Sequence, residues 1–87
     1  MHYVYVLVEK ASQRRYIGFT SDLQRRMAQH ACGRGAKSTR SGSWKLAYYE
    51  AFANKRDAAL RERRLKHDGR ARYQLMKRIE GSFAGQE

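Results

Sequence analysis

The spacing of hydrophobic residues predicts three β-strands within the first 52 positions. Positions 3–8 are all β-branched, aromatic or leucine, which is typical of a strand that is buried on both faces of a sheet. A polar stretch over 9–14 connects it to a short second strand over 15–20, and so short a link favours an antiparallel hairpin. Alternation over 44–52 predicts the third strand.

Each strand of the predicted hairpin carries a candidate functional tyrosine, Tyr5 in the first strand and Tyr16 in the second. Because side chains alternate between the faces of a strand, Tyr16 shares its face with Gly18. A glycine inside a strand usually marks a bulge, or a point that a ligand or another backbone approaches closely. One of these features is therefore expected at Gly18.

Capping residues predict where the first two helices lie. Ser21 followed by Gln24 fits a capping box, so we expect a helix to start at Ser21 and to end near Gly33. Asn54 is the predicted cap of a second helix that runs to about Lys66.

A third helix is predicted near the C-terminus. Its expected cap is Asp68, and Tyr73, Met76 and Ile79 are expected to form its apolar side. The tail over 81–87 is predicted to be disordered. A chain of 87 residues is long enough for one domain, which we place at 1–80.

The core-facing stripe of the first helix contains two polar residues. With Leu23 as reference, Met27 also faces the core, and so do Arg26 and His30, whereas Arg25 falls on the solvent side. A polar pair in such a stripe is costly unless it binds something. The alternative is structural: an arginine whose stem covers the core, and a helix histidine with a satisfied hydrogen bond.

A carboxylate stands on the apolar stripe of the second helix. Glu62 lies at helical spacing between Ala58 and Leu65, apart from the surface charges. Glu62 is therefore a candidate ligand for a metal ion. An inward glutamate paired with an arginine is the structural alternative.

Charge favours a polyanionic partner. Lys and Arg number 19 against 8 acidic residues, so the formal net charge is +11. Nucleic acid or an acidic membrane surface suits such a charge, although a merely soluble basic protein is equally compatible with it. The apolar run at the N-terminus is too short to cross a membrane. With Cys32 as the sole cysteine, no internal disulfide can form, and the cytoplasm is the expected location.

Basic residues gather in one loop and on the helices. The loop over 32–43 is rich in Gly and Ser and could offer amides and cations to phosphates, although an ordinary solvated loop fits equally well. It matches no P-loop pattern, so no nucleotide cofactor is expected. The candidate nucleic-acid-binding residues are Arg34, Lys37, Arg40, Arg61, Arg63, Arg64 and Lys66.

A workable set for phosphodiester hydrolysis is formed by Tyr5, Tyr16, Arg26, His30 and Glu62. This reaction needs a base, charge neutralisation and help for the leaving oxygen. Arg26 offers a two-pronged donor for phosphate oxygens, and Glu62 can hold one Mg²⁺ or Mn²⁺ ion. Tyr5 could act as the base only with help from the metal and nearby cations, because a free tyrosine has a pKa of about 10. Tyr16 and His30 could orient the water or relay its proton.

The same residues resemble the GIY-YIG nuclease superfamily. The resemblance rests on YVY at 3–5, YIG at 16–18, Arg26, His30 and Glu62, with Tyr3 standing where the family name has Gly. It is closest to the small stand-alone bacterial proteins, and to the structure-specific nuclease branch that carries similar YIGFT and QRRMAQH runs.

This resemblance covers positions 3–79 and implies an α/β protein of the α+β type, with a small three-stranded antiparallel sheet flanked by about three helices. It also implies cleavage of nucleic acid with a single divalent cation. The implied roles are Tyr5 as the general base, with Tyr16 assisting, and Arg26 on the phosphate. His30 would support the proton transfer and Glu62 would bind the metal.

Two functional hypotheses follow. The first is a metal-dependent endonuclease that acts on DNA rather than RNA, with branched, damaged or single-stranded forms as candidate substrates and DNA repair as the setting. A partner protein could supply targeting. The alternative is a non-catalytic, basic nucleic-acid-binding module on the same fold. Oligomeric state is left open by the sequence.

Overall fold

All three predicted strands are present and form one antiparallel sheet. The structure is a computed structural model that describes residues 1–35 and 37–83. Strands β1 (His2–Glu9), β2 (Arg15–Thr20) and β3 (Trp44–Phe52) pair in the order β2-β1-β3. The fold is therefore α+β, as predicted, and β1 is the central strand.

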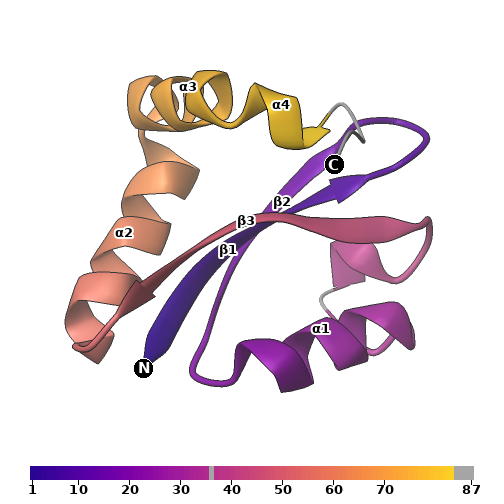
Figure 1. Cartoon of the computed structure of the whole chain (residues 1–87), viewed down its shortest axis with the longest axis horizontal. Helices are drawn as coiled ribbons and strands as arrows, with labels where there is room; N and C mark the ends of the chain where they lie inside the picture. Colours follow the sequence, from indigo (N-terminus) through magenta and orange to yellow (C-terminus); the bar gives the residue numbers. More distant parts are fainter. Residues whose placement is uncertain (36, 84–87) are drawn as a thin grey trace.

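Helices cover both faces of this sheet (Figure 1). Helix α1 (Leu23–Ala31) lies on one face, and a short 3-10 turn, η1 (Lys37–Thr39), follows it in the loop that leads to β3. The other face is covered by helices α2 (Lys55–His67), α3 (Gly69–Arg78) and α4 (Glu80–Phe83). No helix among the described residues is long and apolar enough to cross a membrane.

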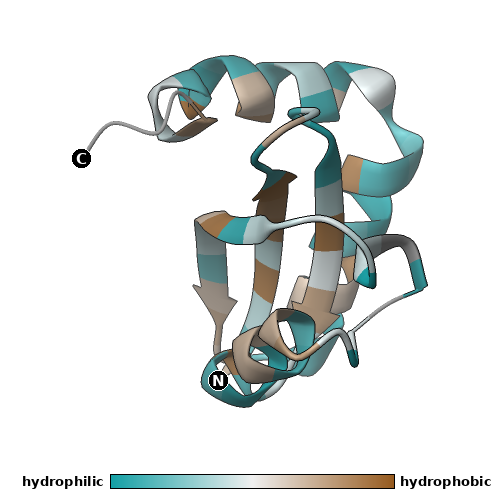
Figure 2. Ribbon diagram, turned by 90° about the vertical axis from the view of Figure 1, so that its right-hand side faces the viewer, coloured by the Kyte–Doolittle hydropathy of each residue, from teal (hydrophilic) through white to brown (hydrophobic). Residues whose placement is uncertain are grey.

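The hydrophobic core lies between the sheet and the three C-terminal helices. Figure 2 shows that the hydrophobic residues are concentrated in the strands, while α2 and α3 are mainly hydrophilic. Val4, Val6 and Val8 of β1 belong to this core, and Tyr5 and Leu7, on the opposite face of the strand, are equally buried. Burial of both faces of β1 is therefore confirmed. The core consists of Val4, Val6, Val8, Ile17, Ala58, Leu65, Leu75, Ile79 and Phe83.

Two of the three predicted helix caps are confirmed. Asn54 and Asp68 each accept hydrogen bonds from backbone N–H groups in the first turn of the helix that follows. The prediction at Ser21 is wrong by one residue, since Asp22 caps α1 and accepts from the Arg25 N–H at 3.1 Å. The Asp22 N–H itself donates to the Thr20 hydroxyl at 3.1 Å.

The C-terminal predictions need two corrections. Tyr73 is 64% exposed, and Leu75 takes the buried position on α3 beside Ile79. The disordered tail does not begin at position 81, because Phe83 ends α4 and is buried in the core. The guanidinium of Arg15 lies 4.0 Å from the centroid of the Phe83 ring, a cation–π contact that holds α4 against β2. The rest of the predicted tail, 84–87, lies outside the described residues.

A buried carboxylate at the end of β1 ties two loops together. Glu9 accepts hydrogen bonds from the backbone N–H and hydroxyl of Ser12, and from the backbone N–H of Ser43. The N–H groups of Ser43 and Ser12 stabilise the charged form and lower the pKa of Glu9 from 4.5 to about 2. Glu9 therefore links the β1–β2 turn to the segment that enters β3.

Replacing Glu9 with Gln is expected to lower the melting temperature at pH 7, because the charge-assisted hydrogen bonds are lost. A depressed pKa stabilises the fold above the unfolded value of 4.5, and that contribution disappears as the pH falls toward 2. Thermal melts of the wild type and Glu9→Gln between pH 7 and pH 2.5 should show that the difference between their melting temperatures becomes smaller in acid. Glu80→Gln, at an exposed position, is the control. A difference that stays constant with pH would contradict the assignment.

Candidate active site

Tyr5 occupies the centre of the sheet face that α1 covers. It is 1% exposed, and its ring lies directly over Gly18 of the neighbouring strand. A Cβ atom at Gly18 would be only 2.3 Å from Cζ and from the hydroxyl oxygen of Tyr5. The pairing of β1 with β2 is regular at this point. The close approach expected at Gly18 is thus made by the Tyr5 side chain, and no bulge forms there.

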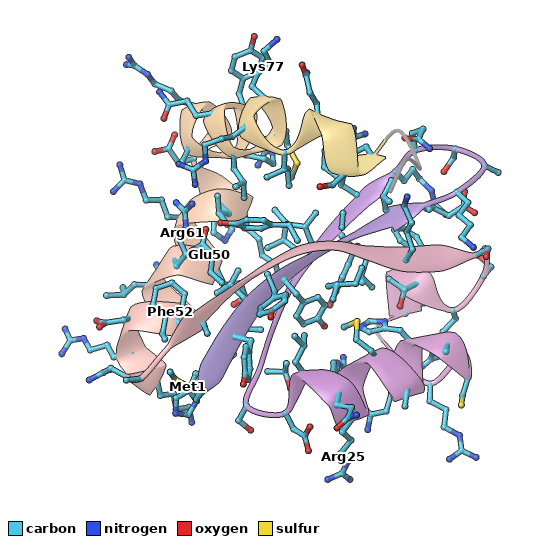
Figure 3. All side chains as sticks on the ribbon, in the orientation of Figure 1. Met1, Arg25, Glu50, Phe52, Arg61 and Lys77 are labelled. Carbon is cyan, nitrogen blue, oxygen red and sulfur yellow. The ribbon has the colours of Figure 1, made fainter. Side chains whose placement is uncertain are left out.

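The hydroxyl of Tyr5 joins two residues of α1. It forms a hydrogen bond of 2.9 Å with Nε2 of His30, and Arg26 Nε donates to it at 3.4 Å. A second hydrogen bond, from Arg26 Nη1 to Gln29 Oε1 at 2.8 Å, orients the guanidinium. Arg26 and His30 therefore face the sheet as predicted. Arg25 is exposed and points away from the sheet (Figure 3).

The second tyrosine completes an aromatic cluster at the β2 edge. The ring centroid of Tyr16 lies 6.3 Å from that of Tyr5 and 5.6 Å from that of His30. Tyr16 is only half-buried, whereas Tyr5 and His30 are buried. The cluster is consequently open to solvent on the side of Tyr16.

Helix α2 brings its carboxylate to this same edge. Glu62 is half-buried and pairs with Lys66, whose Nζ lies 3.0 Å from Glu62 Oε2 and 5.9 Å from the centroid of the Tyr16 ring. The Glu62 charge also acts on the ionisation of Tyr5. The partner of Glu62 is therefore a lysine of its own helix, and no arginine among residues 1–35 and 37–83 pairs with it.

Burial controls the protonation states in the cluster. Desolvation raises the pKa of Tyr5, the hydrogen bond from Arg26 opposes this rise, and the Glu62 charge adds to it. Desolvation, followed by the charge of Arg26, lowers the pKa of His30, so the imidazole is neutral at physiological pH. Tyr5 is consequently a neutral phenol, and further positive charge is needed before it can act as a base.

Two residues that contact His30 were missed by the sequence analysis. The Thr39 hydroxyl lies 2.8 Å from His30 Nδ1, and Thr39 is only 1% exposed. A Cβ atom at Gly35 would come within 2.2 Å of the same nitrogen. Both belong to the loop that was considered as a phosphate-binding segment. Nothing in the sequence distinguishes them from its other small polar residues.

Some of the predicted nucleic-acid-binding residues form ion pairs with other side chains of the protein. Arg61 is engaged, because its guanidinium pairs with the Glu50 carboxylate of β3 at 2.9 Å, as Figure 3 shows. Lys66 is engaged on the opposite, β2 side of α2. Binding by this set stays a prediction. The exposed members are Arg34, Lys37, Arg40, Arg63, Arg64 and Lys66, of which Arg64 also pairs with Asp68 at 3.8 Å.

Glu62 is the residue of the cluster suited to hold a metal ion. Within 1–35 and 37–83, no group of three or more His, Cys, Asp or Glu side chains could enclose one. A hard cation such as Mg²⁺ needs only one or two carboxylates when water and substrate phosphates complete its shell, so a single carboxylate fits it. The ion pair with Lys66 is no obstacle, because a pair at i,i+4 spacing contributes roughly 0.3–0.5 kcal/mol.

The order of these residues along the chain matches a known catalytic domain. Residues 1–75 match the family described as the GIY-YIG catalytic domain. The chain belongs to the GIY-YIG family. This is a nuclease family whose members generally use a divalent metal ion, and it implies binding of nucleic acid.

Relatives of this GIY-YIG protein occur in bacteria and archaea. A UPF0213 protein of Lactiplantibacillus plantarum is 47% identical over 73 residues, which cover 80% of this chain and 71% of the relative. One from Halobacterium salinarum is 42% identical over 77 residues, covering 87% and 99%. The solution NMR structure of a UPF0213 protein from Bacillus halodurans shares 41% identity at a TM-score of 0.55, covering 87% of this chain and 82% of that one.

Proposed function

We propose that this protein is a metal-dependent endonuclease that hydrolyses phosphodiester bonds in DNA. The observation that carries the proposal is the convergence of Tyr5, Arg26 and His30 in one hydrogen-bonded group. Tyr16 and Glu62 lie at the open side of that group. A polar pair such as Arg26 and His30 in the core-facing stripe of a helix is costly unless it binds something, and this cost favours a functional role.

Arg26 is the residue that we assign to the scissile phosphate. Its guanidinium is held by Tyr5 and Gln29, so its planar fork is oriented before a substrate arrives. A groove of about 370 Å³ is lined by Arg25, Arg26 and Gln29 of α1 and by residues 19–22, which include Asp22. An open groove beside two arginines suits a polyanion strand better than a small molecule.

Proton transfer is assigned to the tyrosines and His30. Tyr5 is the general base for the attacking water, and the neutral His30 accepts a hydrogen bond or a proton from it at 2.9 Å. Tyr16, at the solvent side, orients the water. A divalent ion held by Glu62 would neutralise charge on the phosphate and stabilise the departing oxygen. Mg²⁺ and Mn²⁺ are the proposed ions.

Replacement of Glu62 by Gln tests this function. We expect the rate of nicking of supercoiled plasmid and of branched oligonucleotides to fall about 100-fold or more, because metal-ion catalysis contributes several kcal/mol. DNA affinity, measured by filter binding in EDTA, should change little. Oligonucleotides of the same sequence in DNA and RNA form would decide the substrate class. The rates should be measured with Mg²⁺ and with Mn²⁺.

The control for this experiment is Glu80→Gln, which removes one negative charge at an exposed site. Equal nicking by the wild type and Glu62→Gln would identify a contaminating nuclease and contradict the mechanism. A wild type that binds DNA with a steep salt dependence, yet cleaves with neither ion, would support the non-catalytic binding module.

A further inference from the structure

Both ring nitrogens of His30 are engaged inside the protein. Nε2 contacts the Tyr5 hydroxyl at 2.9 Å, and Nδ1 contacts the Thr39 hydroxyl at 2.8 Å. His30 is 7% exposed and Thr39 is 1% exposed. Gly35 closes the same side of the ring, since a Cβ atom there would overlap Nδ1. The loop before β3 therefore encloses His30 from the side opposite Tyr5.

The hydrogen-bond partners of Tyr5 decide which nitrogen of His30 carries the proton. A neutral imidazole has one N–H and one acceptor nitrogen. The Tyr5 oxygen already accepts from Arg26 Nε. Among the described residues, His30 Nε2 is the acceptor within reach of the Tyr5 O–H. If Nε2 carried the proton, this buried O–H would have no acceptor there, a state that costs free energy. The contacts thus favour the tautomer protonated at Nδ1.

We propose that Thr39 is a positioning residue that accepts a hydrogen bond from His30 Nδ1–H, and thereby keeps Nε2 available for the proton of Tyr5. The catalytic meaning of this contact rests on the proposed nuclease function. In the step it serves, the Tyr5 O–H bond breaks and an Nε2–H bond forms. Nδ1 keeps its proton, and the phenolate remains beside the Arg26 guanidinium. The loop thus acts on the interior of the site in addition to presenting its exposed cations.

NMR of the whole protein tests the tautomer without any need for activity. Long-range ¹H–¹⁵N spectra report which ring nitrogen is protonated, and a His30→Gln variant assigns the signal against His2 and His67. We expect the Nδ1–H form in the wild type and in Thr39→Ser. In Thr39→Val, which keeps the shape but lacks the hydroxyl, we expect a shift toward the Nε2–H form. An Nε2–H wild type, or a Thr39→Val signal unchanged from the wild type, would overturn the proposal.

Kinetics supply the second test. Thr39→Val should lower kcat about 10–100-fold, the range known for groups that orient metal-bound histidines, and should leave KM unchanged. Thr39→Ser should restore most of the rate. Thr39→Val with full kcat would overturn the positioning role. A wild type without nuclease activity would contradict the proposed function alone, because the NMR result would still decide the tautomer. A backbone amide spectrum close to that of the wild type confirms that each variant is folded.

Discussion

Replacing Tyr5 with Phe is expected to lower the rate of DNA cleavage by about 10²–10⁴-fold, the usual contribution of a general acid or base. The phenyl ring can keep its packing over Gly18, so the fold should survive. The hydroxyl that links His30 to Arg26 is lost. Single-turnover cleavage with Mg²⁺, alongside thermal melts, separates the chemical effect from the structural one.

The matched control for this variant is Tyr73→Phe, which removes a hydroxyl from a side chain that is 64% exposed. It should cleave at the wild-type rate. If Tyr5→Phe retained more than half of the wild-type rate while folded, Tyr5 could not be the base. Tyr16, the half-buried phenol beside it, would then have to be tested in the same way.

Replacing Gly18 with Ala is expected to destabilise the protein by about 1–3 kcal/mol, the typical cost of overpacking a filled site. The new Cβ would fall 2.3 Å from Cζ of Tyr5, so the ring must move. Movement of the ring would also break its contacts with His30 and Arg26, and cleavage should fall together with stability. Urea unfolding gives the first quantity, and single-turnover cleavage gives the second.

A double-mutant cycle shows whether the contact between Tyr5 and position 18 causes the loss of stability in Gly18→Ala. In a Tyr5→Ala background the space above Gly18 is free, so the additional cost of Gly18→Ala should almost vanish. Gly81→Ala is the matched glycine control, since no atom lies within 4 Å of a Cβ built there. An equal cost of Gly18→Ala in both backgrounds would show that strand propensity, and not Tyr5, requires the glycine.

Much of the fold could be predicted because its signals are local. The strand over 44–52 follows directly from alternation, and the caps Asn54 and Asp68 follow from side chains that accept hydrogen bonds from nearby backbone N–H groups. The start of α1 was misplaced because Ser21 and Asp22 are both good caps. In the structure, the Asp22 N–H bonds to the Thr20 hydroxyl, a contact that a search for capping residues does not consider.

Features that depend on distant contacts could not be predicted. Phe83 stands in a short polar stretch, and its packing against the core and Arg15 depends on residues far away in the sequence. In the sequence, Arg61 cannot be distinguished from the other surface cations. Its ion pair with Glu50 of β3 is formed only in the folded structure.

In the candidate site too, local features could be predicted and features that depend on distant contacts could not. The helical stripe was enough to select Arg26 over Arg25, because their burial differs by position on a single helix. The contact of Thr39 with His30 depends on the path of a loop, so spacing along the sequence carries no trace of it.

Strand β1 contributes Val4, Val6 and Val8 to the core, and its other face buries Leu7 and Tyr5, whose hydroxyl bonds to His30 and Arg26. Directed evolution of this protein should therefore find almost no tolerated diversity at 4–8. A library aimed at new substrates is better concentrated on the exposed cations of the loop before β3 and on the outer side of α1. At these positions, a change of side chain alters the surface that would contact a substrate and leaves the packing of the sheet unchanged.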